Sequence, residues 1–285
     1  MLTPKQSGWF MLAWFSFQIV LALLAGLIGT EASALWQGVL GLAGNLVPVL
    51  LAYIIYRIKR GHITAAQRAV HSFIPMNRPK IDLLIYAAAL GILVQPAAML
   101  ISALSSAFDS GSIETINQIA AESPPAAALA ALAVIPAITE ELVARGVALN
   151  GFKGVSPVKA ALVNGLIFGL MHMNLRQFFY AFALGALLAM LVIKGGNVIY
   201  AVIVHFVLNA SQISLVPAIF SIMSEEAAAM GYLLVLPLSV WGVIVIYRHF
   251  GRKAEEQTRE GARAFGPGLL IYVILSGLIM VSEFL

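Results

Sequence analysis

The residues of this chain that are best suited to chemistry form three short patterns, each inside a long apolar run. Glu140-Glu141 precedes Arg145, His172 stands near the end of the next run, and His205 precedes Asn209 by four residues. An ionised side chain at the centre of a bilayer costs at least ~2.5 kcal/mol on insertion scales, so a charged group in such a run is a candidate for function. Carboxylates, imidazoles and an amide supply what activation of water and stabilisation of an oxyanion require.

The two acids of the first pattern differ in their expected surroundings. Residues four apart lie on one face of a helix, so Glu141 can pair with Arg145, whereas Glu140 is turned by ~100° and points elsewhere. One carboxylate is then neutralised, and the other stays free to act as a general base. The structural alternative is an ion pair without catalysis, because charges near the ends of spans often reach the polar boundary.

The other two patterns also have structural alternatives. His172 alone is consistent with a hydrogen-bonded packing residue. His205 and Asn209 share a helix face, so they can present an imidazole and an amide to one point or make a helix–helix hydrogen bond. Serine catalysis has little support, because neither Ser211 nor Ser214 has an obvious pair of base and orienting group. A phosphate-binding P-loop is absent from the sequence.

Composition decides which elements must hold these groups. Of the 285 residues 61% are hydrophobic and only 11% charged, whereas soluble domains carry about 25% charge. This composition indicates a polytopic membrane protein. The sequence has no cysteine, which excludes disulfides and thiolate chemistry. Its net charge of +4 comes from Lys and Arg clustered in short loops, so we interpret it as a signal for orientation rather than for binding nucleic acid.

The predicted fold class is all-α, a bundle of about nine transmembrane helices that forms one integral domain over residues 1–285. The predicted spans cover about 9–29, 35–58, 81–104, 126–150, 157–173, 177–193, 198–220, 227–247 and 267–285. The triplet Ala32-Ser33-Ala34 resembles a signal-peptide cleavage site. Cleavage there would leave eight spans, but the first run is longer than a signal peptide requires, so we expect it to be retained.

Loop charge predicts a multi-pass protein of the cell membrane with its N-terminus in the cytoplasm and its C-terminus outside. The most basic loop runs from Arg57 to Lys80 and contains His62 and His71, which we interpret as solvated. Its mixture of cations with apolar residues predicts a helix lying on anionic lipid, and the apolar residues concerned are Ile63, Val70, Phe73 and Ile74. The loop after 81–104 carries acids but no Lys or Arg, which is typical of an external loop.

Taken together, the three patterns resemble the CPBP family of intramembrane proteases, which includes the CAAX prenyl endopeptidases of the Ras-converting type. The resemblance rests on Glu140-Glu141-x-x-x-Arg145, Phe168-x-x-x-His172 and His205-x-x-x-Asn209, and it covers about 126–214, the predicted catalytic core. It implies hydrolysis of a peptide bond in a membrane-bound or lipidated protein or peptide. The lipid bilayer and that substrate are the expected partners, without nucleic acid, and the sequence leaves the oligomeric state open.

The resemblance also implies a role for each matched residue. Glu140 would activate the hydrolytic water together with His172, and His205 and Asn209 would stabilise the oxyanion. The supporting residues would be Glu141 and Arg145, which position the base, and Phe168 of the second motif.

No cofactor is expected, although zinc is a candidate. His172, His205 and Glu140 could form a set of three ligands. However, the sequence has no H-E-x-x-H pair, and a metal-bound Glu140 would leave the reaction without its base. We therefore expect catalysis without a metal.

Two other functions fit the same residues. The charged and imidazole groups could form a proton or cation relay in a transporter, or the chain could be a catalytically idle member of the family that acts as a scaffold.

The depth of each group in the membrane bears on the choice among these functions. At ~1.5 Å per residue, Glu140 and His205 lie ~15 and ~13 Å from the cytoplasmic ends of their spans, but His172 lies ~22 Å from Pro157. Convergence of the three groups therefore requires that the fifth span tilts or begins in a membrane-embedded turn.

Overall fold

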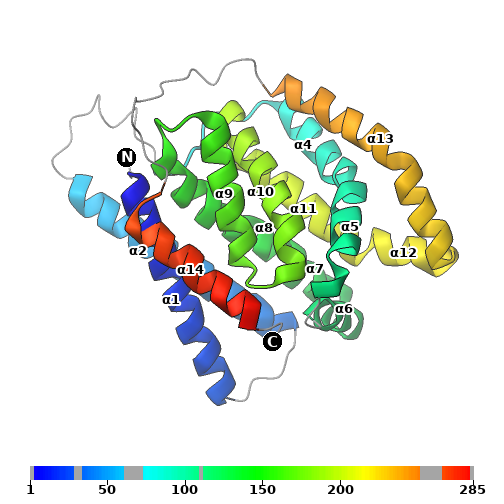
Figure 1. Cartoon of the computed structure of the whole chain (residues 1–285), viewed down its shortest axis with the longest axis horizontal. Helices are drawn as coiled ribbons and strands as arrows, with labels where there is room; N and C mark the ends of the chain where they lie inside the picture. The colour runs from blue at the N-terminus through cyan, green and yellow to red at the C-terminus, as the bar shows by residue number, and fades with distance from the viewer. Residues whose placement is uncertain (1–2, 29–33, 61–72, 109–111, 251–264, 283–285) are drawn as a thin grey trace.

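The computed structural model of the chain describes residues 3–28, 34–60, 73–108, 112–250 and 265–282, and within these ranges the fold is all-helical, without a β-strand (Figure 1). The N-terminal helices are α1 (Pro4–Ile28), α2 (Ala34–Arg60), α4 (Ile81–Leu93), α5 (Gln95–Leu104), the 3₁₀ turn η1 (Ser106–Phe108) and α6 (Ser112–Glu122). The central helices are α7 (Pro125–Leu129), η2 (Ala130–Val134), α8 (Ile135–Glu141), η3 (Leu142–Ala148), η4 (Leu149–Phe152), α9 (Pro157–Met171), α10 (Leu175–Gly195) and α11 (Ile199–Ile213). The C-terminal helices are α12 (Leu215–Ile222), α13 (Glu225–His249) and α14 (Pro267–Ser282).

Seven helical segments in the described ranges are long and apolar enough to cross a membrane. They coincide with seven of the nine predicted spans, which confirms a multi-pass membrane architecture. The other two predicted spans, α9 and α14, are apolar helices of 15 and 16 residues, whereas a bilayer core of ~30 Å needs about 20 residues. The structure therefore does not confirm the count of nine.

The loops differ from expectation in two places. The acidic segment that we predicted as a loop contains the helix α6. Phe73, predicted to lie on a lipid-bound helix, is buried outside any helix and packs against Tyr53 and Tyr56, with ring centroids 5.5 and 5.2 Å apart. Burial against aromatic rings removes this side chain from the lipid surface. Ile74, from the same predicted helix, is also outside any helix and is partly buried. Residues 61–72, with His62 and His71, lie outside the described residues, as does most of the predicted cleavage site.

The span that carries the acidic pair is not a regular α-helix. α8 is only seven residues long, and it lies between two π-helical segments, η2 and η3. Pro136 at the start of α8 has no N–H to bond the carbonyl of Leu132, four residues earlier, and this interrupts the α-helical ladder. π segments of this kind are often found at functional sites.

Glycines let the helices around this span approach closely. α9 and α10 form an antiparallel pair, and Gly165 and Gly169 face α10 as the sequence predicts, because a Cβ at either glycine would collide with its backbone or with Phe178. α11 packs against α4, α8 and α10. On the opposite side of α8 lies α2, which in turn packs against α1. The first turns of α1 and α14 touch through Gly8 and Gly268, so these two helices run in the same direction (Figure 1).

Candidate active site

The predicted ion pair of the acidic motif is present and fully buried. Arg145 Nη1 lies 2.7 Å from Glu141 Oε1, and neither side chain is exposed to solvent. Arg145 also donates through Nη2 to the carbonyl of Gly185 on α10 at 2.9 Å. The guanidinium is therefore held between the motif and α10, which gives the pair a fixed geometry.

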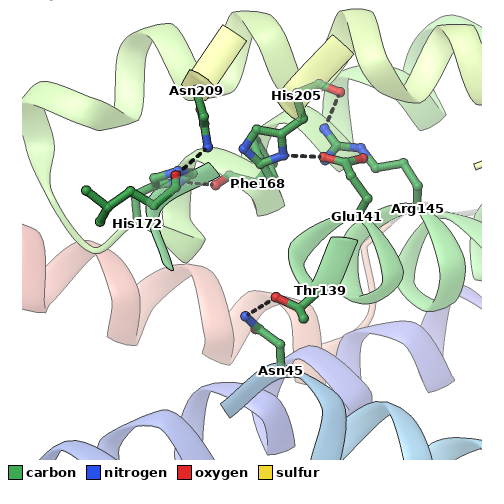
Figure 2. Close-up of polar contacts among 10 residues, drawn as sticks. Asn45, Thr139, Glu141, Arg145, Phe168, His172, His205 and Asn209 are labelled. Atoms are coloured by element: carbon green, nitrogen blue, oxygen red, sulfur yellow. Dashed lines mark hydrogen bonds and ion pairs between the residues drawn. The ribbon is translucent and has the colours of Figure 1, made fainter. Parts of the chain in front are cut away.

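Glu141 has a second partner that the sequence did not indicate. His205 Nδ1 on α11 lies 3.0 Å from the same oxygen, Oε1, and both side chains are buried (Figure 2). A carboxylate accepts hydrogen bonds, so Nδ1 carries the proton in this contact. His205 and Asn209 thus meet different groups, although they share a helix face.

Phe168 is the apolar centre of the cluster. Its ring stands edge-on to His172 and to His205, with centroids 5.1 and 5.5 Å apart. The guanidinium carbon of Arg145 lies 4.1 Å from the centroid of the same ring, a distance at which a cation is attracted to an aromatic face. One aromatic side chain therefore brings both imidazoles to the buried ion pair.

His172 is oriented by the backbone at the end of α9. The helix ends at Met171, and the chain turns through Met173, whose φ is 49°, before Asn174 caps α10 by accepting from the N–H of Gln177. His172 Nδ1 donates to the carbonyl of Phe168 at 2.9 Å, which leaves Nε2 available for other groups.

The turn before α9 is buried in protein. Residues 149–152 are all buried, and Asn150 donates to the carbonyl of Phe73 at 2.8 Å. Lys153 and Lys159, on either side of the first residue of α9, are exposed. That the fifth span tilts or begins in a membrane-embedded turn stays a prediction.

Each acid of the motif has one carboxylate oxygen without a partner. Oε2 of Glu140 and Oε2 of Glu141 are buried and have no hydrogen-bond partner among the described residues. Glu140 interacts electrostatically with His172, with Arg145 and with Tyr180 of α10. Glu141 differs in that its Oε1 is held by Arg145 and His205. That Glu140 acts together with His172 stays a prediction.

Asn209 makes a helix–helix hydrogen bond. Its Nδ2 donates to the carbonyl of Leu132 in η2 at 3.3 Å (Figure 2). In a regular α-helix the N–H of residue 136 would bond this carbonyl, but proline has no N–H. Part of the role of Asn209 is therefore to supply a hydrogen bond to that carbonyl. The second hydrogen of the amide remains available.

Comparison with known proteins agrees with this arrangement. Residues 122–211 match the family model Rce1-like, described as type II CAAX prenyl endopeptidase Rce1-like. The match covers 90 of the 285 residues, and within them the chain resembles this family. No curated protein and no solved structure matches the chain.

The Rce1-like segment contains every residue predicted for the site. It starts just before α7 and ends within α11, so it includes both π segments, the ion pair, His172, His205 and Asn209. The helices α1, α2, α4 and α5 lie outside the matched segment. Tyr180 lies inside it, and no spacing in the sequence pointed to that residue, because its electrostatic interaction with Glu140 depends on the tertiary structure.

The candidate site does not bring together the three zinc ligands that the sequence left open. In the part of the chain that the structure describes, no three His, Cys, Asp or Glu side chains come together as a group that could hold a metal ion. His172, His205 and Glu140 therefore do not form such a group, and His205 directs Nδ1 to Glu141 instead. No step below runs through a metal.

Proposed function

We propose that this chain is an intramembrane endopeptidase that hydrolyses a peptide bond in a membrane-anchored or lipidated protein or peptide. One observation carries the proposal: Glu140 has a buried oxygen, Oε2, without a partner and interacts electrostatically with His172, whereas Glu141, whose Oε2 is also without a partner, is held through Oε1 by Arg145 and His205. A buried carboxylate oxygen without a partner is costly in an apolar interior, and the ion pair of Glu141 leaves Glu140 as the acid available for chemistry. The match of residues 122–211 to the Rce1-like family model supports the same class of reaction.

The reaction starts with Glu140 as general base. The carboxylate takes a proton from a water molecule, and the water oxygen forms a bond to the carbon of the scissile carbonyl. When the tetrahedral intermediate collapses, the C–N bond breaks and the proton passes from Glu140 to the leaving amine. His172 presents Nε2 to the same region because Phe168 holds Nδ1, so it can orient the water.

Two groups on α11 are suited to the oxyanion. Asn209 has one amide hydrogen beyond the one given to Leu132. His205 uses Nδ1 toward Glu141, so it donates from Nε2 only when the ring is protonated.

The proposed topology places the N-terminus in the cytoplasm and the C-terminus outside, with the site opening to the cytoplasmic side of the cell membrane. The parallel course of α1 and α14 supports an odd number of crossings. α9 and α14 complete nine spans if the bilayer thins around them, at a cost of fractions of a kcal/mol per Å of mismatch.

Hydrolysis in liposomes tests the function. Purified protein is reconstituted with two fluorescent peptides, one anchored by a C-terminal prenylated cysteine and the other by a transmembrane helix. We expect new carboxyl termini that carry ¹⁸O when the reaction runs in H₂¹⁸O. Proton or cation flux without cleavage would favour a transporter instead. The absence of both flux and cleavage, with either peptide, would indicate a scaffold.

Substitution of His172 tests its part in activating water. We expect His172→Ala to lower kcat by ~10²-fold or more, within the range for proton-transfer groups, while thermal unfolding in detergent changes little because only one hydrogen bond, to Phe168, is lost. Wild-type turnover by His172→Ala would remove this residue from the mechanism.

Chelation tests whether a metal takes part. We expect full cleavage after exhaustive treatment with a zinc chelator and dialysis, because Glu140 itself serves as the base. Activity that is lost and returns only with added Zn²⁺ would contradict a metal-free mechanism.

A further inference from the structure

A buried asparagine on α2 contacts the helix of the acidic pair from the side opposite to α11. Asn45 Nδ2 donates to Thr139 Oγ1 at 3.1 Å, and both side chains are buried (Figure 2). Thr139 directly precedes Glu140. Asn45 lies outside the Rce1-like segment, which starts at residue 122. The family motifs therefore give this residue no role.

Asn45 is itself held by α1. Its Oδ1 accepts from Trp14 Nε1 at 2.9 Å and from Gln18 Nε2 at 3.4 Å. The helices approach closely at this point, because a Cβ on Gly44 would collide with Gln18. A buried amide that makes three hydrogen bonds has little freedom to rotate, so the donor reaching Thr139 is fixed from both sides.

Helical geometry relates this contact to Glu140. Thr139 and Glu141 are two residues apart on α8, which places them ~200° apart around the axis, on nearly opposite faces. Thr139 is bonded to α2, and Glu141 is bonded to α11 on the other side (Figure 2). Glu140 stands between them without a hydrogen bond of its own at Oε2. Its direction is therefore set by how its two neighbours are held.

The short helix α8 needs such external support. Its seven residues lie between two π segments, and its first turn contains Pro136. Neither neighbouring segment continues the α-helical ladder, so rotation of α8 is less restrained by its own backbone than in a long regular helix.

We propose that Asn45 and Thr139 are positioning residues that fix the rotation of α8 and so aim the Glu140 carboxylate at its substrate. The inference rests on the proposed function in one respect, the role of Glu140 as base. A displacement of about 1 Å at a catalytic group can cost ~10²-fold in rate, so loss of this single hydrogen bond has a large expected effect on turnover.

Thr139→Val and Thr139→Ser form a matched pair for the activity test. Valine keeps the shape of threonine and removes the hydroxyl, whereas serine keeps the hydroxyl. We expect Thr139→Val to lower kcat by ~10- to 10²-fold with KM within about twofold, and Thr139→Ser to restore most of the activity. Ser7→Ala is the control, because it removes another buried hydrogen bond from α1 to the same span, at Ala148, eight residues after Glu140 and beyond α8. Equal losses of kcat in Thr139→Val and Ser7→Ala would overturn the proposal.

A second measurement does not depend on catalysis. The chain has no cysteine, so Glu140→Cys introduces a single thiol whose rate of reaction with a small methanethiosulfonate reports how position 140 is presented. We expect that rate to change severalfold when Thr139→Val is added, and to stay near the starting value with Thr139→Ser or Ser7→Ala. An unchanged rate in Thr139→Val would refute the positioning role even if the chain proves not to be a protease. Absence of cleavage by the wild type, with the expected labelling pattern, would refute the proposed function alone.

Discussion

Glu140→Gln is expected to lower kcat for peptide cleavage by ~10²- to 10⁴-fold, the range that a positioned general base contributes. The change is nearly isosteric and removes the group that accepts the proton of water. Stability should change little or rise, because the wild-type carboxylate keeps a buried oxygen without a partner and an amide is less costly in an apolar interior than a charge. Cleavage rates in liposomes and thermal unfolding in detergent, measured on the same preparation, test both statements.

The neighbouring acid is the matched control for that experiment. Glu141→Gln removes the same charge one residue away, but it also breaks the hydrogen bonds from Arg145 and His205. We expect this variant to lose stability as well as activity. If Glu140→Gln unfolds the protein as much as Glu141→Gln does, or if it cleaves at the wild-type rate, Glu140 is not the base.

Arg145→Met is expected to destabilise the protein by ~3–5 kcal/mol, the usual cost of removing one partner of a buried ion pair. Methionine fills part of the volume, but it leaves Glu141 charged and takes away the contacts with Gly185 and with the ring of Phe168. The hydrogen bond from His205, the second partner of Glu141, remains and offsets part of this cost. Chemical unfolding in mixed micelles, followed by circular dichroism, gives the free energy of unfolding.

A double mutant separates charge from packing in this pair. Arg145→Met combined with Glu141→Gln leaves no unpaired charge, and we expect it to recover most of the lost stability without recovering activity, since the support for His205 is also gone. If the double mutant is as unstable as Arg145→Met alone, packing rather than charge dominates the contribution of Arg145.

The contacts predicted from the sequence are those that depend on helical spacing. The four-residue separation of Glu141 and Arg145 predicts their pairing, and this pairing is present. The helical repeat alone decides which face each residue occupies, so no knowledge of the tertiary structure is needed.

The contacts that the sequence did not predict join helices far apart in the chain. His205 bonds Glu141 from 64 residues away, and Asn45 bonds Thr139 from 94. Spacing gives the face of a residue but not the helix it will meet. The two π segments beside Pro136 likewise depend on contacts with neighbouring helices. The count of nine spans is not confirmed, because apolar composition does not fix where a helix such as α9 begins and ends.

The backbone of the Rce1-like span has a consequence for the biosynthesis of this protein. Its carbonyls at Leu132 and Ala148 accept side-chain hydrogen bonds from Asn209 on α11 and Ser7 on α1. The carbonyl of Ala144 accepts from Asn164 on α9 as well as from the backbone N–H of Leu149. Because polar backbone groups in hydrocarbon need partners, we expect this span to complete its irregular form only after the helix that carries Asn209 has been made. The irregular turns that shape the site would then couple its maturation to the order in which the chain is made.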